Sequence, residues 1–315
     1  MREIVLGKSG IKVTELCFCA LPMGPAQKNM DVESSSKVVA EALLNGINFI
    51  DTAQIYRTYE PIRNAMKSTG IRPVIATKSP ALTYEDMEKS IHEALEMLDV
   101  DYIDIFLLHA ARAELDVFEV RGEALRCLID YKNKGIITAV GISTHSVGIV
   151  KLAAENPDID IVFPILNKIG MGVLGGTLMD MEAAIEYCFA KDKGVYIMKA
   201  LAGGNLIGDY ADAVGYVREF ASNRAPVAIG MVSTDEVRMN TAYFNGEKIN
   251  YIINFEQTKK FLIVPSLCKL CGECYDTCHS GAISLGEKIA VIDNEKCLCC
   301  GYCVTVCPQF AIRMI

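Results

Sequence analysis

Short apolar runs alternate with amphipathic stretches along the first 255 residues of the chain. The stretches repeat their apolar positions every three or four residues, which is typical of helices, whereas the short runs are typical of buried strands. Such alternation predicts repeated β-α units around a parallel sheet. The predicted strands are Glu15–Ala20, Ile47–Asp51, Val74–Lys78, Ile103–His109, Ile137–Ile142, Ile161–Leu166, Val195–Lys199 and Val227–Met231.

The helical stretches between these runs have recognisable ends. A hydroxyl residue followed three positions later by an acidic residue is typical of a helix N-terminus, and Gly is typical of a C-terminus. Capping pairs stand at Thr83 and Asp86, Thr177 and Asp180, and Ser233 and Glu236, with glycines at Gly135 and Gly194. Eight strands alternating with helices predict a (β/α)8 TIM barrel. A doubly wound open sheet is the alternative, but no Gly-x-Gly-x-x-Gly follows the first strand.

The rest of the chain predicts a second, smaller domain. We assign residues 1–255 to an α/β barrel and residues 256–315 to a small α+β domain. The net charge of -8 argues against a nucleic-acid surface, because phosphate binding needs clustered Lys and Arg. The first residues show no signal-peptide core and no apolar run approaches a bilayer span. A cytoplasmic protein with no membrane partner is therefore predicted.

The thirteen cysteines fall into two groups. Cys17, Cys19, Cys127 and Cys188 are scattered through apolar surroundings, where thiols are usually core fillers. The other nine lie within residues 268–307. In a cytosolic chain, such crowding indicates metal ligation rather than disulfides.

The crowded cysteines form the same array twice, with spacing C-x2-C-x2-C-x3-C. Iron-sulfur clusters take four thiolates, and in two-cluster proteins the fourth cysteine of each array ligates the other cluster. The predicted ligands of the first [4Fe-4S] cluster (cluster 1) are Cys268, Cys271, Cys274 and Cys307, and those of the second (cluster 2) are Cys278, Cys297, Cys300 and Cys303. A zinc ribbon is the alternative, but its two-pair spacing fits poorly.

Residues 266–315 resemble bacterial two-cluster ferredoxins. Cys307-Pro308 keeps the usual pattern of that family, whereas His279 stands where the family usually has Pro. Cys299 is the ninth cysteine and has no ligand position in the scheme.

Polar residues terminate three predicted strands of the first domain. Asp51, Lys78 and His109 each end an apolar run, and Tyr56 follows Asp51 in the next loop. In a barrel of this class the chemistry gathers at the C-terminal strand ends, so all four are candidate catalytic residues. Each also has a structural reading: a strand-end Asp often caps the next helix, a lone Lys is usually solvated, and a His after an apolar strand can be a satisfied core group.

Most of residues 1–245 resembles the aldo-keto reductases, specifically the branch with a C-terminal ferredoxin-like extension. The matching segments appear in family order: Leu6–Val13, Asp51–Tyr56, Ala76–Lys78, Asp101–His109, Gly141–Ser146 and Met198–Gly204. The resemblance implies a catalytic tetrad of Asp51, Tyr56, Lys78 and His109.

The resemblance also implies the chemistry: reduction of a carbonyl with NAD(P)H, or the reverse oxidation of an alcohol. Tyr56 would be the proton donor, since tyrosine holds its proton at neutral pH with a reference pKa of about 10. We expect Lys78, paired with Asp51, to favour the phenolate and so ease the transfer of that proton. His109 would orient the substrate oxygen.

A nicotinamide site is implied by the same resemblance. The matching positions are Ser143, Thr144 and Asn167 for the carboxamide, and Lys199, Leu201, Gly203 and Gly204 along the pyrophosphate. Three departures alter this site: Cys19-Ala20 replaces the usual Gly-Thr, Phe163 replaces Gln and Ala200 replaces Pro.

The segment Gly230–Asn240 matches the adenosine-binding loop of the family, which implies contacts from Ser233, Glu236 and Asn240. NADPH-using members commonly carry Arg at the position of Glu236. A carboxylate repels a 2′-phosphate but accepts a hydrogen bond from a free 2′-hydroxyl, so NADH is favoured over NADPH. Arg238 is the nearby counter-argument, although two residues along a helix it points to another face.

Two function classes remain open. The first is an enzyme acting on a small carbonyl or alcohol substrate. The second is an electron-transfer protein, or a ferredoxin-linked one-electron reductase, with a redox protein as partner. Hydride carries two electrons together, whereas each cluster exchanges one, and the chain shows no flavin-binding motif to couple them. Substrate identity and reaction direction depend on strand-end loops, which a single sequence leaves open.

Overall fold

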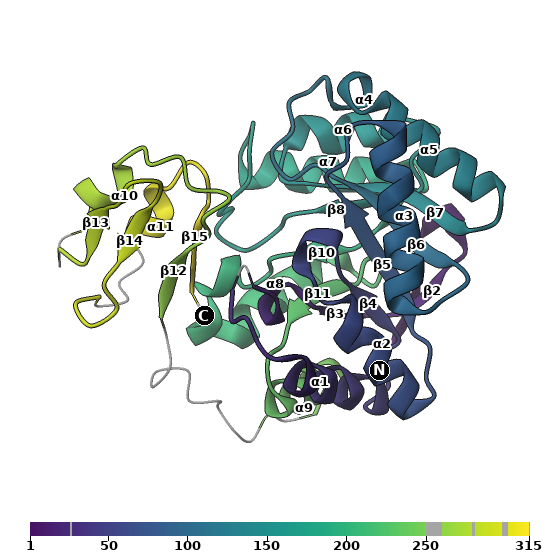
Figure 1. Cartoon of the computed structure of the whole chain (residues 1–315), viewed down its shortest axis with the longest axis horizontal. Helices are drawn as coiled ribbons and strands as arrows, with labels where there is room; N and C mark the ends of the chain where they lie inside the picture. Colours follow the sequence, from purple (N-terminus) through teal and green to yellow (C-terminus); the bar gives the residue numbers. More distant parts are fainter. Residues whose placement is uncertain (26, 248, 250–259, 279–280, 298–301, 315) are drawn as a thin grey trace.

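The computed structural model describes residues 1–25, 27–247, 249, 260–278, 281–297 and 302–314 (Figure 1). A helix-wrapped barrel makes up most of the chain, and a smaller domain built from the C-terminal residues stands at its left in Figure 1. The boundary predicted between residues 255 and 256 lies outside the described residues, as do His279, Cys299 and Cys300.

The barrel is a parallel sheet in the order β10-β11-β3-β4-β5-β6-β7-β8-β9. Only Tyr196 separates β9 from β10, so the two are halves of one strand and the sheet closes as an eight-stranded barrel. This confirms the predicted fold. The strands are β3 (Leu16–Cys19), β4 (Phe49–Asp51), β5 (Val74–Ser79), β6 (Ile103–His109), β7 (Ile137–Thr144), β8 (Ile161–Pro164), β9 (Gly194–Val195), β10 (Ile197–Met198) and β11 (Val227–Gly230).

Most of the predicted strand ends differ from the observed ones by one or two residues, and two of the differences have a clear local reason. The strand predicted to run to Leu166 ends at Pro164, which has no backbone N–H to donate to the ladder. The strand predicted at Val195–Lys199 is interrupted at Tyr196 and ends at Met198, because Lys199 takes a left-handed conformation with φ of 62°.

A hairpin that the sequence did not predict closes the N-terminal end of the barrel. It consists of β1 (Glu3–Val5) and β2 (Lys12–Thr14), and it places Leu6 and Val13 in the same buried cluster as the inward-facing strand residues. Gly7 is required here, since a Cβ would lie 2.4 Å from the carbonyl oxygen of Asp192.

Amphipathic helices cover the outside of the barrel. They are α1 (Val32–Leu44), α2 (Tyr59–Thr69), α3 (Tyr84–Leu98), α4 (Val117–Val120), α5 (Gly122–Asn133), α6 (Val147–Glu155), α7 (Leu178–Ala190), α8 (Tyr210–Ala221) and α9 (Thr234–Phe244). Of the three predicted capping pairs, Thr177 and Asp180 form the full reciprocal box. At α3 and α9 the Thr83 and Ser233 side chains accept from the third helical N–H as predicted, but the acidic partner does not return the bond. None of the described helices is long and apolar enough to cross a membrane.

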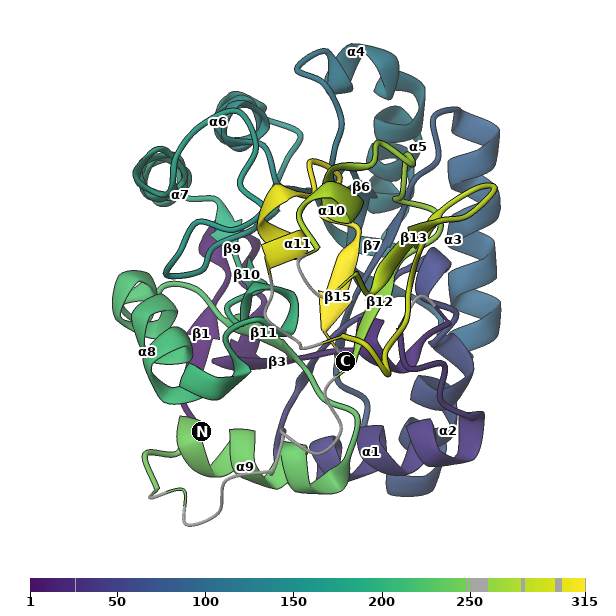
Figure 2. The same ribbon diagram turned by 90° about the vertical axis from the view of Figure 1, so that its left-hand side faces the viewer.

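The described part of the C-terminal domain contains two antiparallel strand pairs and two short helices. β12 (Phe261–Ile263) pairs with β15 (Ile312–Met314), and β13 (Ile283–Leu285) pairs with β14 (Ala290–Ile292). The helices are α10 (Glu273–Asp276) and α11 (Tyr302–Val306). Seen from the side of this domain, these elements stand in front of the barrel strands (Figure 2). β15 contacts the turn Ala202–Gly204 that follows β10, so the domain lies against the C-terminal mouth of the barrel.

Candidate functional site

A buried ion pair joins two neighbouring strand ends at the mouth of the barrel. Lys78 Nζ donates to both carboxylate oxygens of Asp51, at 2.7 and 2.8 Å, and to the carbonyl of Thr52 at 2.7 Å. The two side chains are 1% and 0% exposed. The pair forms because β4 and β5 are adjacent and in parallel register, which brings polar residues at their ends together.

Tyr56 and His109 lie beside this pair. The two rings meet edge to face with their centroids 5.9 Å apart, and Lys78 Nζ lies 4.8 Å from the centre of the Tyr56 ring. Burial, with smaller contributions from the charges of Lys78 and Arg121, lowers the pKa of His109 well below its usual value, so the imidazole is neutral. The structure thus brings all four predicted tetrad residues together at one end of the barrel.

One expectation about this group differs from the structure. We expected Lys78 to lower the pKa of Tyr56, but burial first and the negative charge of Asp51 second raise that pKa well above its usual value. The three donors of the Lys78 ammonium are taken by Asp51 and Thr52, so none is left for the Tyr56 hydroxyl. Tyr56 therefore holds its proton firmly.

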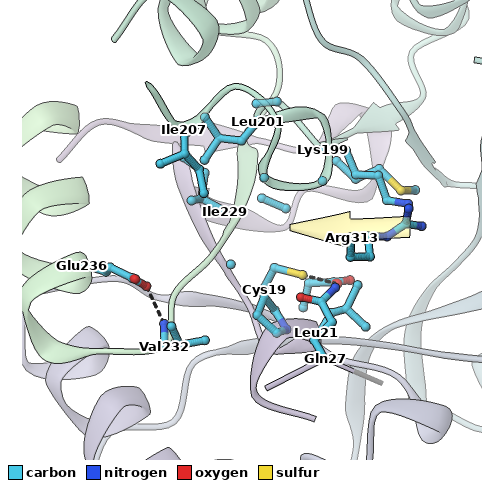
Figure 3. A pocket seen from close by; sticks show the side chains of 18 of the residues that line it. Cys19, Leu21, Gln27, Lys199, Leu201, Ile207, Ile229, Val232, Glu236 and Arg313 are labelled. Carbon is cyan, nitrogen blue, oxygen red and sulfur yellow. Dashed lines mark hydrogen bonds between the residues drawn. The ribbon is translucent and has the colours of Figure 1, made fainter. Parts of the chain in front are cut away.

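A cavity runs from Asp51 and Tyr56 along the mouth of the barrel, whereas Lys78 and His109 lie outside its lining. Figure 3 shows side chains that line it. Asp51, Tyr56 and Phe163 line one end. Lys199 stands at the side opposite Glu236 (Figure 3), Leu201, Gly203 and Gly204 line the middle, and Glu236 and Asn240 line the far end. The two glycines have φ of 67° and 101°, a left-handed conformation that leaves bare backbone on the cavity wall.

The other predicted nucleotide contacts lie outside the lining of this cavity. Ser143 Oγ donates to the Leu108 carbonyl, and Thr144 Oγ1 accepts from the Ser146 amide. The Asn167 side chain is bound at both ends by the backbone of Met171, at 2.9 Å each. Ser233 caps α9. In these positions each side chain already has a structural partner, and its role toward a nucleotide stays a prediction.

The far end of the cavity combines one acid and one base. The Glu236 carboxylate accepts from the backbone N–H of Val232 at 2.6 Å, and burial raises its pKa against the opposing charge of Lys28. Lys28 lines the same cavity and was missed in the sequence because it lies in a loop without a motif. Arg238 points away and pairs with Glu41 at 2.8 Å, as its position on the helix predicted.

Two further aromatic residues shape the tetrad end. The Tyr196 hydroxyl donates to Asp51 Oδ1 at 2.9 Å, and its ring stacks on Phe163 with centroids 3.7 Å apart. Tyr196 was not singled out in the sequence, where it reads as one more apolar position of a strand.

Cys19, expected to fill the core, instead lines the cavity with its thiol 3.7 Å from Asp51 Oδ2. Cys17, Cys127 and Cys188 are buried as expected.

The four cysteines predicted for cluster 1 line one small cavity in the C-terminal domain. Cys268, Cys271, Cys274 and Cys307 all face it, and the charges of the other three raise the pKa of Cys274, after burial. Backbone amides point at two of the sulfurs, from Leu270 to Cys268 at 3.4 Å and from Ala311 to Cys307 at 3.3 Å. Four thiols around a shared space, with N–H groups directed at them, fit a cubane cluster.

The residues of cluster 2 are described only in part. Cys278, Cys297 and Cys303 belong to the described chain and pack against its core, whereas Cys300 lies outside it.

Comparison with known proteins decides the family. The profile described as "Aldo/keto reductase family" matches residues 15–260. The chain belongs to the aldo/keto reductase family. A second profile, "4Fe-4S dicluster domain", matches residues 267–311, so this member carries a ferredoxin domain C-terminal to the barrel. The chain therefore combines an aldo/keto reductase barrel with a 4Fe-4S dicluster domain.

The most informative relatives match one domain each. The barrel is 29% identical over 216 residues to L-galactose dehydrogenase of Arabidopsis thaliana, covering 64% of this chain and 66% of that protein. The ferredoxin domain is 49% identical over 47 residues to one component of an ion-translocating oxidoreductase complex of Methanosarcina acetivorans, covering 15% of this chain and 18% of that protein. The chain thus spans less than two thirds of either relative.

Solved structures support the fold of the barrel. An aldo-keto reductase from Bacillus halodurans in its holo form superposes with a TM-score of 0.65 at 20% identity, covering 79% of this chain and 93% of that one.

Proposed function

We propose that the chain reduces a small carbonyl compound, or oxidises the corresponding alcohol, with NAD(P)H as hydride carrier and Tyr56 as proton donor. The observation that carries the proposal is the buried Asp51–Lys78 pair beside Tyr56 and His109, at one end of a cavity that continues past two bare glycines. When bound along Leu201, Gly203 and Gly204, NAD(P)H would supply the hydride for the carbonyl carbon. NADH is the favoured form because Glu236 stands at the adenosine end.

The residues at this end would complete the reaction by handling the oxygen. As negative charge grows on the carbonyl oxygen, the Tyr56 hydroxyl donates its proton, and the product is an alcohol. The raised pKa of Tyr56 keeps that proton in place until an oxyanion is there to take it. Neutral His109 can donate one N–H to the same oxygen, while Lys78 and Asp51 hold a fixed dipole beneath the phenol ring.

The ferredoxin domain is proposed to hold two [4Fe-4S] clusters. Cluster 1 would be bound by Cys268, Cys271, Cys274 and Cys307, and cluster 2 by Cys278, Cys297, Cys300 and Cys303. When bound, the clusters supply one-electron carriers or structural cross-links. Anaerobic analysis should find about eight irons and eight sulfides per chain. Stoichiometric zinc without sulfide would contradict this assignment.

Replacement of Tyr56 by Phe tests the barrel chemistry. Tyr56→Phe should lower turnover roughly 10²- to 10⁴-fold, the usual contribution of general acid catalysis, while leaving NADH binding within about twofold. Tyr187→Phe, on the outer face of α7, is the matched control and should leave both unchanged. Near-normal turnover of Tyr56→Phe under anaerobic conditions would remove this tyrosine from the mechanism.

A second candidate function is a ferredoxin-linked one-electron reductase that serves a redox protein partner. It is supported by the closeness of the two sites: the backbone amide of Phe310 donates to the Cys307 carbonyl at 2.9 Å, and the Phe310 ring lies 4.7 Å from Lys199 Nζ in the cavity wall. Anaerobic absorbance separates the candidates. Loss of NADH with a carbonyl supports the first, and bleaching only by dithionite or reduced ferredoxin supports the second.

A further inference from the structure

The last strand of the ferredoxin domain brings an arginine to the barrel cavity. Arg313, on β15, is 5% exposed and lines the same cavity as Asp51 and Tyr56. A Cβ on Gly203 would lie 3.4 Å from Arg313 Cδ, so the arginine packs directly on the turn after β10. Figure 3 shows Arg313 beside Lys199, at the opposite end from Glu236. The ferredoxin domain thus contributes a side chain to the site of the barrel.

Arg313 and Lys199 share one aromatic support. Arg313 Cζ lies 4.1 Å from the centre of the Phe310 ring, and Lys199 Nζ lies 4.7 Å from the same point. Contact with a ring holds a cation in place but leaves its full charge. Two basic groups are therefore held close together in one wall of the cavity.

No carboxylate neutralises these charges in the described part of the chain. Arg313 donates to the carbonyl of Ile312 at 3.1 Å, and the charges that oppose its loss of a proton come from Cys307 and Tyr56. For Lys199, the interaction that opposes the loss of its proton comes from Cys19. Arg112 adds a third positive charge, and its Nη2 is buried without a partner among the described residues.

The pKa shifts agree with an excess of positive charge. Burial, then Arg313 and Arg112, lower the pKa of Lys199 well below its usual value, and burial and Arg112 lower the pKa of Arg313 to about 10. Buried cations without a counter-ion are costly. Cys307 opposes the lowering of the pKa of both arginines, whereas for Lys199 that opposition comes from Cys19 and not from Cys307.

The charges stand at the end of the cavity where a carbonyl would react. The positive charge of Arg313 acts to lower the pKa of Tyr56, against the larger rise that burial causes. At the adenosine end the corresponding cation beside Glu236 is Lys28. An anion held by Arg313 and Lys199 would therefore lie near Tyr56 and away from the adenosine end.

We propose that Arg313 and Lys199 form a subsite for a carboxylate group of the substrate, so that the substrates are oxo acids and the matching hydroxy acids. This assignment replaces the pyrophosphate contact that the family resemblance implied for Lys199. The planar guanidinium group suits bidentate bonds to a carboxylate, and the ammonium adds a second, point-like charge. This inference rests on the proposed function for its reaction, but the subsite itself can be measured by binding alone.

The experiment compares 4-oxopentanoate and pyruvate with their methyl esters, which keep the carbonyl and remove the charge. With NADH under anaerobic conditions, the wild-type kcat/KM should be at least about tenfold higher for the acids than for the esters. Arg313→Gln should bring this ratio close to one while leaving the ester kcat/KM, the NADH affinity and the iron content within about twofold. Arg313→Lys should restore part of the ratio. Arg126→Gln, an exposed arginine on α5, is the matched control.

Three results would overturn the subsite. In the first, the wild-type protein has the same kcat/KM for acids and for esters. In the second, Arg313→Gln weakens NADH binding and leaves the acid-to-ester ratio of kcat/KM unchanged. In the third, inorganic phosphate competes with NADH, with an inhibition constant similar to the dissociation constant of the acids. Calorimetric titration of wild-type protein and Arg313→Gln with 4-oxopentanoate separates this inference from the proposed function. Acid binding that depends on Arg313, without NADH-dependent turnover, would keep the subsite and refute only the reaction.

Discussion

The buried Asp51–Lys78 pair predicts a large and pH-dependent loss of stability when one partner is removed. Lys78→Met keeps most of the volume of the side chain and removes only its charge and donors. The Asp51 carboxylate would then keep the Tyr196 hydroxyl at 2.9 Å and the weak thiol contact of Cys19 at 3.7 Å. A carboxylate left with so few partners at 0% exposure is the costly product of this substitution.

The size of the effect follows from the contacts that are lost. Lys78 gives up three hydrogen bonds of 2.7 to 2.8 Å, two of them to the carboxylate. Breaking a buried pair in this way costs about 3–5 kcal/mol of unfolding free energy. Burial already raises the pKa of Asp51, and the Lys78 ammonium opposes that rise. The variant should therefore have a higher folded pKa for Asp51 than the wild type.

The direction of the pH dependence follows from this difference. An unfolded Asp has a pKa of about 3.9. A carboxyl group with a raised folded pKa contributes stability that is present below the unfolded pKa and is lost as the pH rises to the folded one. The gap between variant and wild type should therefore widen as the pH passes from the folded pKa of the wild type to that of the variant, by at most about 1.4 kcal/mol per pH unit.

Anaerobic urea unfolding followed by far-UV circular dichroism at pH 5.5 and 7.5 measures this gap. Lys89→Met is the matched control, because the Lys89–Asp86 pair is 77% and 58% exposed and should be worth less than about 1 kcal/mol. The double variant Asp51→Asn/Lys78→Met should recover part of the loss, since no buried charge remains. The reasoning is refuted if Lys78→Met costs no more than Lys89→Met at pH 7.5.

Three further substitutions test other parts of the molecule. Cys278→Ser should lower the iron content from about eight to about four per chain, because cluster 2 loses a ligand; unchanged iron would refute the crossed ligation. Glu236→Gln should tighten NADPH binding about threefold to tenfold relative to NADH by removing a negative charge beside the adenosine site; an unchanged ratio would separate Glu236 from nucleotide choice. Arg112→Met should speed hydrogen exchange in residues 307–313, since Arg112 Nη1 donates to the Pro308 carbonyl at 2.8 Å and to Gln309 Oε1 at 3.2 Å; unchanged exchange would show that these bonds do not anchor the ferredoxin domain.

The sequence predicted those features that repeat or that lie next to one another in a regular element. Strand periodicity was sufficient for the barrel, and because parallel strands end at the same edge, it was also sufficient to bring Asp51 near Lys78. The cysteine arrays could be read because ligand spacing is a local property of the chain. Glu236 and Arg238 could be separated because helix geometry fixes which residues share a face.

Side chains positioned by tertiary packing could not be read in this way. Tyr196 interrupts its strand and bonds Asp51, yet in the sequence it is one apolar residue among others. Asn167 fits a nucleotide motif, but that motif does not reveal the two bonds between its side-chain amide and the backbone of Met171. Arg313 reaches the cavity only because one domain docks on the other, and neither periodicity nor spacing describes that docking.

The docked segment also bears on why a hydride-transferring barrel would carry iron-sulfur clusters. Three residues with different roles lie within the seven positions from 307 to 313. Cys307 is a predicted ligand of cluster 1, the Phe310 ring contacts Lys199 and Arg313, and Arg313 lines the cavity. The conformation of this segment is tied to Cys307, whose carbonyl accepts from the Phe310 amide and whose sulfur accepts from the Ala311 amide. A ligand that holds the Cys307 sulfur would therefore also restrain the backbone at Phe310 and Ala311, which leads into the strand that carries Arg313. A structural role for cluster 1 at the mouth of the barrel needs no coupling between one-electron and two-electron steps, so the mismatch between hydride and cluster chemistry is no argument against the barrel reaction.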